Sequence, residues 1–486
     1  MHDRRAACLP AGFRRAAALA MLVILPALAP RPARAQGAPG DSIPPAPASR
    51  LPDLQAAPGD SIPPATARLP DLRGTPGDSL RWRFELGGST DITNEIYFED
   101  AFIDTAFLGR QQITSPEIRW AGVGYVGLSG TRAAGTTRYD FSDEVSVGNL
   151  LSRETAWLSW RADFAPDWRL VIGPNFDYRH DRTLDRDMNE WHGSMFARVR
   201  RDFTEDASAL ELGARGDVLR ADGPGSEFVL DRNAAGGDLA FESFPAASPD
   251  WRVGYHFTAR EFPDSTERDH YEHAWEARFH SDRARGFGWS IETSGERRVT
   301  MRPAPTSRDN FWDERANATL DALNPDRWSL RAELDGEAIQ YDVQDSTLFF
   351  NYQVVRAVVG PRLSGGAWSL WIAPRAEALF SQLDPGEGYL ETGGQVEFEY
   401  LGARAWWNVT PAAGWRQYAN DPRAIEEGLG ELHSSFAFYE LTLFGDQALP
   451  ARLRLRTMIT ARWEPHTDDV QNAGSLYFSV DVRRLF

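Results

Sequence analysis

Apolar and polar side chains alternate along most of the chain between residues 81 and 486. The segment from residue 328 is typical, because Trp328, Leu330 and Leu334 share one parity and charged residues take the other. Its charged positions are Arg331, Glu333, Asp335 and Glu337. A side-chain period of two places one set on each face of a β-strand. The pattern therefore predicts strands with one apolar face and one polar face.

Short turns rich in Pro, Gly, Asp and Asn divide this pattern about every 40 residues. Several open the same phrase, since Pro-Asp-Trp-Arg occurs at residues 166 and 249 and Pro-Asp-Arg-Trp at 325. Such a repeat indicates a recurring supersecondary unit, here a hairpin with one tight turn and one longer loop. A soluble β-propeller repeats at a similar length, but each blade needs four short strands. These repeats hold two strands of about 11 to 15 residues, long enough to cross a membrane at a tilt.

The predicted fold is all-β: a transmembrane antiparallel up-and-down β-barrel of about 20 strands, within a range of 18 to 22, over residues 81–486. The Trp after each tight turn would lie at the membrane interface, where its ring is buried and its N–H stays wet. An even strand number brings both ends of the barrel to one rim. Barrels of roughly 16 to 18 strands already enclose an aqueous channel, so a lumen is expected.

Two segments precede the predicted barrel. Residues 1–35 combine a basic start, an apolar run too short to span a bilayer and the cleavage pattern Ala33-Arg34-Ala35, as a secretory signal peptide does. Residues 36–80 are Pro-rich, and Ala-Pro-Gly-Asp-Ser recurs at residues 38 and 57. We expect an extended periplasmic linker there, either a plain spacer or an arm that touches peptidoglycan or a periplasmic protein.

Composition narrows the possible partners. The formal net charge is -18, and residues 1–35 hold six Arg and one Asp (+5), so the remaining chain is near -23. This sign argues against nucleic acid as a partner. Cys8 is the only cysteine and lies in the predicted signal peptide, which leaves the mature chain without disulfides or thiolate metal sites. No cofactor is expected.

The carboxy-terminal strand carries the most specific motif. Phe478, Val480, Val482 and Phe486 share one face, and the chain stops on the aromatic residue. This ending resembles the terminal strand of bacterial outer-membrane β-barrel proteins, which the barrel-assembly machinery reads; Arg484 departs from the pattern. The resemblance implies a porin-like architecture in the outer membrane of a Gram-negative cell envelope, with both termini periplasmic. It also implies contacts with outer-membrane lipid and lipopolysaccharide.

Inward-facing charges would set the selectivity of the lumen. The side chains expected to line it are Arg169, Arg252, Arg331, Glu333, Asp335, Glu337, Arg452, Arg454 and Arg456. Ladders of one sign favour ions of the other, whereas opposite charges on neighbouring strands pair and hold the wall. Pairing is the expectation for most of these residues. The stripe at residues 452–456 is the expected exception, because the strands next to it in sequence offer few acids in phase.

Other chemistry has little support in the sequence. The acidic loops, with Asp181, Asp185 and Asp187, Asp264, Glu267 and Asp269, and Asp468 and Asp469, are expected to be solvated rather than to bind calcium. His192 and Ser194 resemble the His/Ser pair of outer-membrane phospholipase, but about 7 Å separates them along a strand, too far for a hydrogen bond. His270 and His273 fall on opposite faces of a strand, which argues against a metal site. No catalytic residue is expected.

These observations predict a channel for passive or substrate-biased passage of small polar or charged solutes. The alternative is a structural or interaction barrel whose lumen is plugged. Residues 91–116 are apolar enough to fold inward as a constriction. An outer-membrane enzyme such as a lipase is the remote alternative.

Overall fold

The computed structural model describes residues 79–486 apart from short gaps. The gaps are residues 104–105, 115–118, 184–185, 205–207, 225, 227–228, 245–248, 284–286, 303–309, 323–327, 345–350, 382–387, 420–432 and 468–471. The predicted signal peptide and nearly all of the predicted linker lie outside the described residues. In the part of the chain that the structure describes, no helix is long and apolar enough to span a membrane.

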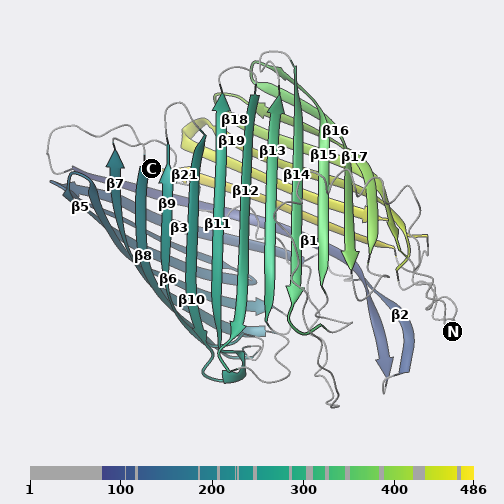
Figure 1. The fold of residues 1–486 in the computed structure, drawn as a ribbon, viewed down its shortest axis with the longest axis horizontal. Helices are drawn as coiled ribbons and strands as arrows, with labels where there is room; N and C mark the ends of the chain where they lie inside the picture. The colour runs from purple at the N-terminus through teal and green to yellow at the C-terminus, as the bar shows by residue number, and fades with distance from the viewer. Residues whose placement is uncertain are drawn as a thin grey trace, which may run out of the picture. The chain divides into compact units, whose positions relative to one another are not determined.

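Strands make up nearly all of the described chain (Figure 1). Their bounds are β1 Ser79–Ile103, β2 Ala106–Thr114, β3 Arg119–Ala134, β4 Thr137–Gly148, β5 Leu151–Ala165, β6 Trp168–Thr183, β7 Arg186–Thr204, β8 Ser208–Asp222, β9 Arg232–Ser243, β10 Asp250–Glu261, β11 His270–Arg283, β12 Phe287–Thr300, β13 Phe311–Ala322, β14 Trp328–Tyr341, β15 Tyr352–Gly365, β16 Trp368–Ser381, β17 Tyr389–Leu401, β18 Ala405–Tyr418, β19 Phe436–Leu449, β20 Leu453–Glu464 and β21 Ala473–Leu485. Two short 3-10 turns, η2 Thr266–Arg268 and η4 Pro450–Arg452, complete the described elements.

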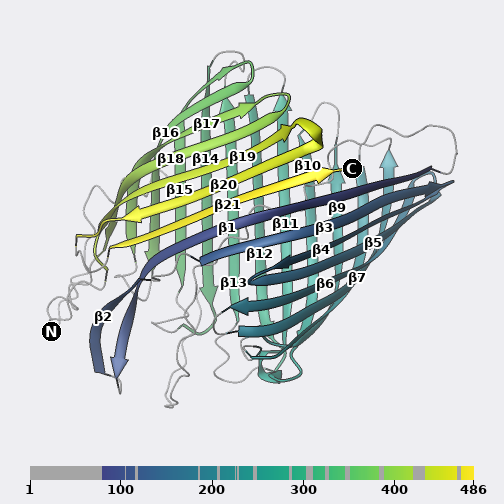
Figure 2. The same cartoon turned by 180° about the vertical axis from the view of Figure 1, so that it is seen from behind.

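Each strand from β3 to β21 pairs antiparallel with the next, and β1 pairs with both β3 and β21. The sheet therefore closes on itself. Because β2 pairs with β1 alone, the described wall holds 20 of the 21 strands. This confirms the predicted antiparallel barrel and its strand number. In Figures 1 and 2 the strands of the near wall run steeply across those of the far wall, as strands tilted in a barrel do.

Closure joins the first strand to the last over twelve residue pairs, from Glu85↔Leu485 to Ile96↔Gly474. The chain end strengthens the seam, because the Phe486 amide donates to the Phe84 carbonyl at 3.0 Å and the two rings lie 5.6 Å apart. Ser79 and Phe486 thus lie at the same rim as the short turns between strands, the rim we call the turn rim.

The period of two separates the wall into two faces. Large apolar side chains such as Trp82, Trp328 and Ile372 are exposed on the outer face, while the opposite parity carries the charged residues. The convex face spreads its side chains, whereas the concave face crowds them together. Crowding buries even polar groups, so Glu391 on the inner face is 1% exposed.

One prediction about a loop is wrong. Residues 91–116 were assigned to a loop, apolar enough to fold inward in the plugged alternative, but β1 continues to Ile103 and pairs with β2 as a hairpin, from Ile96↔Thr114 to Ile103↔Ala106. We call this hairpin the β1–β2 arm. It projects beyond the opposite rim, the loop rim, at the lower left of Figure 2.

Tight turns need backbone conformations that few residues adopt. Gly135 and Gly366 take φ of 59° and 58° in the turns before β4 and β16, where glycine avoids a Cβ clash. Between β19 and β20, Ala451 and Arg452 take φ of 61° and 60°. Arg452 therefore lies in η4 at the turn rim and not within the β20 strand, contrary to the expected stripe.

Candidate functional site

Charged side chains line the inner wall in pairs that lie along it. Among the described residues, every ion pair between two wall strands joins strands no more than three positions apart, the widest being Arg331–Glu397, Arg375–Glu440 and Arg483–Glu144. Long guanidinium side chains reach over the intervening strands to their carboxylates. The inner face therefore carries a continuous layer of ion pairs that run along the barrel wall.

The residues of β14 that were predicted to line the lumen all lie on the inner face, among these ion pairs. Arg331 Nη2 lies 2.5 Å from Glu333 Oε1 and 3.9 Å separates Arg331 from Glu397. Its guanidinium also covers the ring of buried Trp371 at 4.6 Å. Asp335 accepts a hydrogen bond from Asn317. The parity of this strand was readable from its sequence, and its charges are paired rather than free.

The predicted lumen residues on β6 and β10, and the fourth one on β14, are also paired. Arg169 on β6 lies 3.2 Å from Asp163. Arg252 on β10 lies 3.2 Å from Glu276 and 3.6 Å from Glu242. Glu337 on β14 accepts a hydrogen bond from the Tyr352 hydroxyl at 3.1 Å. These contacts agree with the expectation that most inward charges pair.

The expected exception does not hold. Asp446 on β19 stands opposite Arg456 in the register, and its two oxygens bind Arg454 at 2.6 Å and Arg456 at 3.2 Å. The two arginines therefore share one carboxylate, and Arg452 lies in the turn. The prediction failed because the turn length, which sets the register of Asp446 against β20, is not visible in the alternation.

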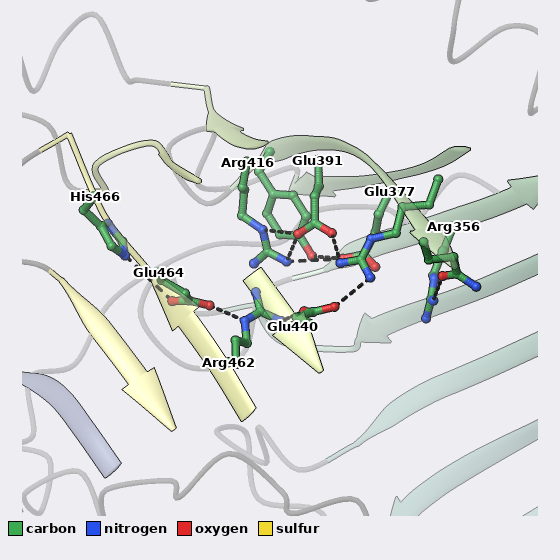
Figure 3. A network of polar contacts seen from close by, with 11 residues as sticks. Arg356, Glu377, Glu391, Arg416, Glu440, Arg462, Glu464 and His466 are labelled. Carbon is green, nitrogen blue, oxygen red and sulfur yellow. Dashed lines mark hydrogen bonds and ion pairs between the residues drawn. The ribbon is translucent and has the colours of Figure 1, made fainter. Parts of the chain in front are cut away.

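One polar cluster of the inner wall was not predicted. We call it the Arg–Glu network; it spans β16 to β20 (Figure 3). Glu391 lies at its centre, with Arg375 at 2.6 Å and Arg416 at 2.7 Å. Arg375 also lies 2.7 Å from Glu440, whose other oxygen lies 2.6 Å from Arg462.

The network continues to the loop rim. Arg462 pairs with Glu464, and His466 Nε2 lies 3.7 Å from the same carboxylate. The Ser434 hydroxyl contacts His466 Nδ1 at 2.7 Å, and the imidazole stacks on Phe436 at 4.4 Å. The last wall strands are thereby tied to residues that flank two loops.

Aromatic rings support the buried charges. Arg375 lies 4.4 Å over the ring of Phe438, which is fully buried. Arg416 lies 3.9 Å over the ring of Tyr389, and the Tyr389 hydroxyl donates to Glu377 at 2.6 Å. Buried ions need such complete pairing because leaving water costs several kcal/mol per ion. The result is a sector of inner wall whose charges are paired with one another and packed against aromatic rings.

Two of the acidic residues that were expected to be solvated are buried instead. Asp269 is 4% exposed and accepts the Phe262 amide at 2.7 Å. Asp181 is also buried and lies 3.2 Å from Arg179. Asp185, Asp468 and Asp469 fall outside the described residues. Within the described ranges, no group of three or more His, Cys, Asp or Glu residues is arranged to hold a metal ion.

The histidines considered for catalysis or metal binding lie apart. His192 and Ser194 share the inner face of β7, where His192 lies 3.4 Å from Asp217 on β8. His270 faces inward, while His273 faces outward and contacts the Tyr255 hydroxyl at 2.6 Å. No described contact joins either pair into one site.

The residues of the terminal motif lie where the alternation placed them. Phe478, Val480 and Val482 pair with Ile92, Thr90 and Gly88 across the seam. They share the outer parity of β21, and Phe486 continues it against Phe84. Arg484 lies 4.6 Å over the Phe486 ring, so the departure from the apolar pattern covers the terminal aromatic residue.

Comparison with known proteins yields structural likeness only. No protein-family model matches the sequence, and no curated protein matches it. The barrel is similar to the siderophore receptor PirA from Pseudomonas aeruginosa, with 9% identity, 84% of this chain and 81% of that chain covered, and a TM-score of 0.48. It is also similar to the FrpB iron transporter from Neisseria meningitidis, with 8% identity, 83% of this chain and 81% of that chain covered, and a TM-score of 0.48. A third similar structure is the alcaligin outer-membrane receptor FauA from Bordetella pertussis, with 12% identity, 82% of this chain and 76% of that chain covered, and a TM-score of 0.46. At these values the likeness carries no functional argument.

Proposed function

We propose that this chain is an outer-membrane β-barrel channel that passes small polar or charged solutes. The observation that carries the proposal is the closed wall of 20 described strands, apolar outside and charged inside. A closed barrel satisfies every backbone group without water and so suits a bilayer. The turn rim, which holds both ends of the barrel, would face the periplasm.

The outer face fits lipid. Trp328 and Trp368 begin β14 and β16 at the turn rim, and both are exposed. Trp120, Trp312 and Trp463 are exposed near the loop rim. Aromatic residues at both ends of an apolar band are typical of membrane-spanning barrels. Recognition by the barrel-assembly machinery and contact with lipopolysaccharide belong to the same proposal.

The inner face fits water and weak ion selectivity. With strands about 4.8 Å apart and tilted by about 40°, a circular wall of this strand number would be about 40 Å across between backbones. Ion pairs that lie along the wall leave the centre free, and their charges largely cancel. Such a lumen should pass solutes with a modest preference of either sign.

A second candidate is a structural barrel whose lumen does not conduct. The observation in its favour is the Arg–Glu network, where inward residues such as Glu391 are almost completely buried. Burial of this degree supports a wall whose inward side chains fill part of the lumen.

Conductance across a planar bilayer separates the two candidates. Purified full-length mature protein should give stepwise currents that scale with salt concentration. Reversal potentials in a salt gradient should indicate weak selectivity. Inserted protein that stays silent at every voltage would contradict the channel and favour the structural barrel.

A further inference from the structure

A recess of about 480 Å³ opens on the inner wall near the turn rim. It lies over β1, β3, β4 and β5, which are neighbours in the near wall of Figure 2. Eight of its eleven lining residues have the inner parity of their strands. The recess is separate from the Arg–Glu network, which begins at β16.

Two rows of paired residues cross these four strands and form the recess. One row runs from strand to strand through Arg81, Thr131, Asp140 and Ser159. The next runs through Arg83, Ser129, Ser142 and Trp157. Small hydroxyl side chains therefore form the floor between two arginines on one side and an indole on the other. Three strand spacings, about 14 Å, separate the two sides.

The charge of the recess is positive although the chain is strongly acidic. Asp140 is its acid, and it is already engaged: Arg138 donates to it at 2.8 Å and the Thr131 hydroxyl at 2.6 Å. Arg83 lies 3.4 Å from Glu85 and is more than half exposed. Arg81 is exposed beside it. Two accessible guanidinium groups on one strand suit a carboxylate or phosphate, which they can bind in a bidentate manner.

Trp157 adds an exposed aromatic surface to the recess. Its indole has inner parity, opposite Asn175 on β6, yet 40% of its surface is exposed. A large ring exposed to the lumen loses the benefit of apolar burial. A flat ligand stacked on it would recover that benefit.

We propose that this recess binds a small organic anion that carries a ring, with the anionic group at Arg81 and Arg83 and the ring against Trp157. The floor hydroxyls of Ser129, Thr131 and Ser159 would bind polar groups of the ring, since each can donate and accept. This inference rests on the proposed channel function, in which the recess would be a binding site for one class of solute along the lumen. Binding itself does not depend on conduction.

Titration calorimetry of the mature protein in detergent tests this site. The probes are glucuronate, a sugar acid, and 4-hydroxybenzoate, an aromatic acid, compared with glucose and inorganic phosphate. We expect one or both acids to bind measurably more tightly than glucose and phosphate. The two acid arms distinguish a saccharide site from an aromatic one.

Variants locate the binding. Arg81→Gln with Arg83→Gln should weaken binding of the acid roughly tenfold or more, as loss of charge-assisted hydrogen bonds does, and Trp157→Leu should weaken it as well. Arg278→Gln is the matched control, because Arg278 is an exposed inner-wall arginine on β11 paired with Glu292. Each variant must keep the fast gel migration of a folded barrel.

Three results would overturn the proposal. They are binding of neither acid, equal weakening by Arg278→Gln, or phosphate binding as tight as the acids with no effect of Trp157→Leu. A silent bilayer experiment with intact acid binding would instead refute the channel and leave this site standing.

Discussion

Replacing Glu391 by Gln should destabilise the barrel more than any exposed charge change. The Glu391 carboxylate bridges Arg375 and Arg416, and its side chain is 2% exposed. Gln keeps the shape and one acceptor oxygen but removes the negative charge. Two guanidinium groups would then face each other across a neutral amide in a site that excludes water.

The magnitude follows from the contacts that remain. Breaking a buried ion pair typically costs about 3–5 kcal/mol, because the partner charge stays buried. Arg375 keeps Glu440 at 2.7 Å and Arg416 keeps Glu377 at 3.5 Å. We therefore expect the lower end, about 3 kcal/mol in the free energy of unfolding.

Urea unfolding in lipid vesicles, followed by tryptophan fluorescence and gel migration, measures this change. Glu292→Gln is the control, because Glu292 pairs with Arg278 at 2.5 Å while 46% of its side chain is exposed. Exposed pairs contribute less than about 1 kcal/mol. The two variants should therefore differ by about 2 kcal/mol, roughly 30-fold in the unfolding constant.

A second substitution tests the cause. Adding Arg416→Met to Glu391→Gln removes one of the two arginines that lose the Glu391 carboxylate and should recover part of the lost stability. Equal destabilisation by Glu391→Gln and Glu292→Gln would refute the reasoning. Further loss in the double variant would refute it as well.

Three more predictions follow from the seam, the inner wall and the closed sheet. Phe486→Ser removes the ring that packs on Phe84, so folded protein in the outer membrane should fall severalfold by immunoblot; Arg484→Tyr should leave it near the wild-type level, and unchanged amounts of the serine variant would show that the terminal motif is not read. Asp446→Asn leaves Arg454 and Arg456 without their shared carboxylate, so reversal potentials should move towards anion preference, whereas an equal shift from Glu267→Gln in the exposed η2 loop would contradict wall-based selectivity. Unheated protein from outer-membrane fractions should migrate faster than heated protein, because a closed barrel resists detergent; recovery in the soluble periplasm without a heat shift would contradict the membrane placement.

The alternation of side chains was sufficient to predict the barrel wall. On β14 the parity of Arg331, Glu333, Asp335 and Glu337 places all four on the inner face, as the register shows. The period of two depends only on local geometry, so it survives whatever the neighbouring strands do. The strand number follows from the spacing of turns for the same reason.

Contacts between strands could not be read in this way. The partner of Arg375 is Glu440, 65 residues further along the chain, and only the closed, curved wall brings them together. Asp446 meets Arg454 and Arg456 because the η4 turn has a particular length and takes positive φ at two residues. The β1–β2 arm was taken for a loop, since turn signals do not show how far a strand runs beyond a rim.

Cysteine accessibility tests most directly whether the two faces of this wall meet lipid and water. Cys8 is the only cysteine, so protein expressed from residue 36 onward offers a background without thiols. Thr460 and Ile459 are neighbours on β20; Thr460 pairs with Thr442 on the inner face and Ile459 with Leu443 on the outer face. In lipid vesicles, a charged maleimide should label Thr460→Cys in the folded protein and label Ile459→Cys only after unfolding. Equal labelling of both, or labelling of Ile459→Cys alone, would contradict a membrane barrel with a water-filled lumen.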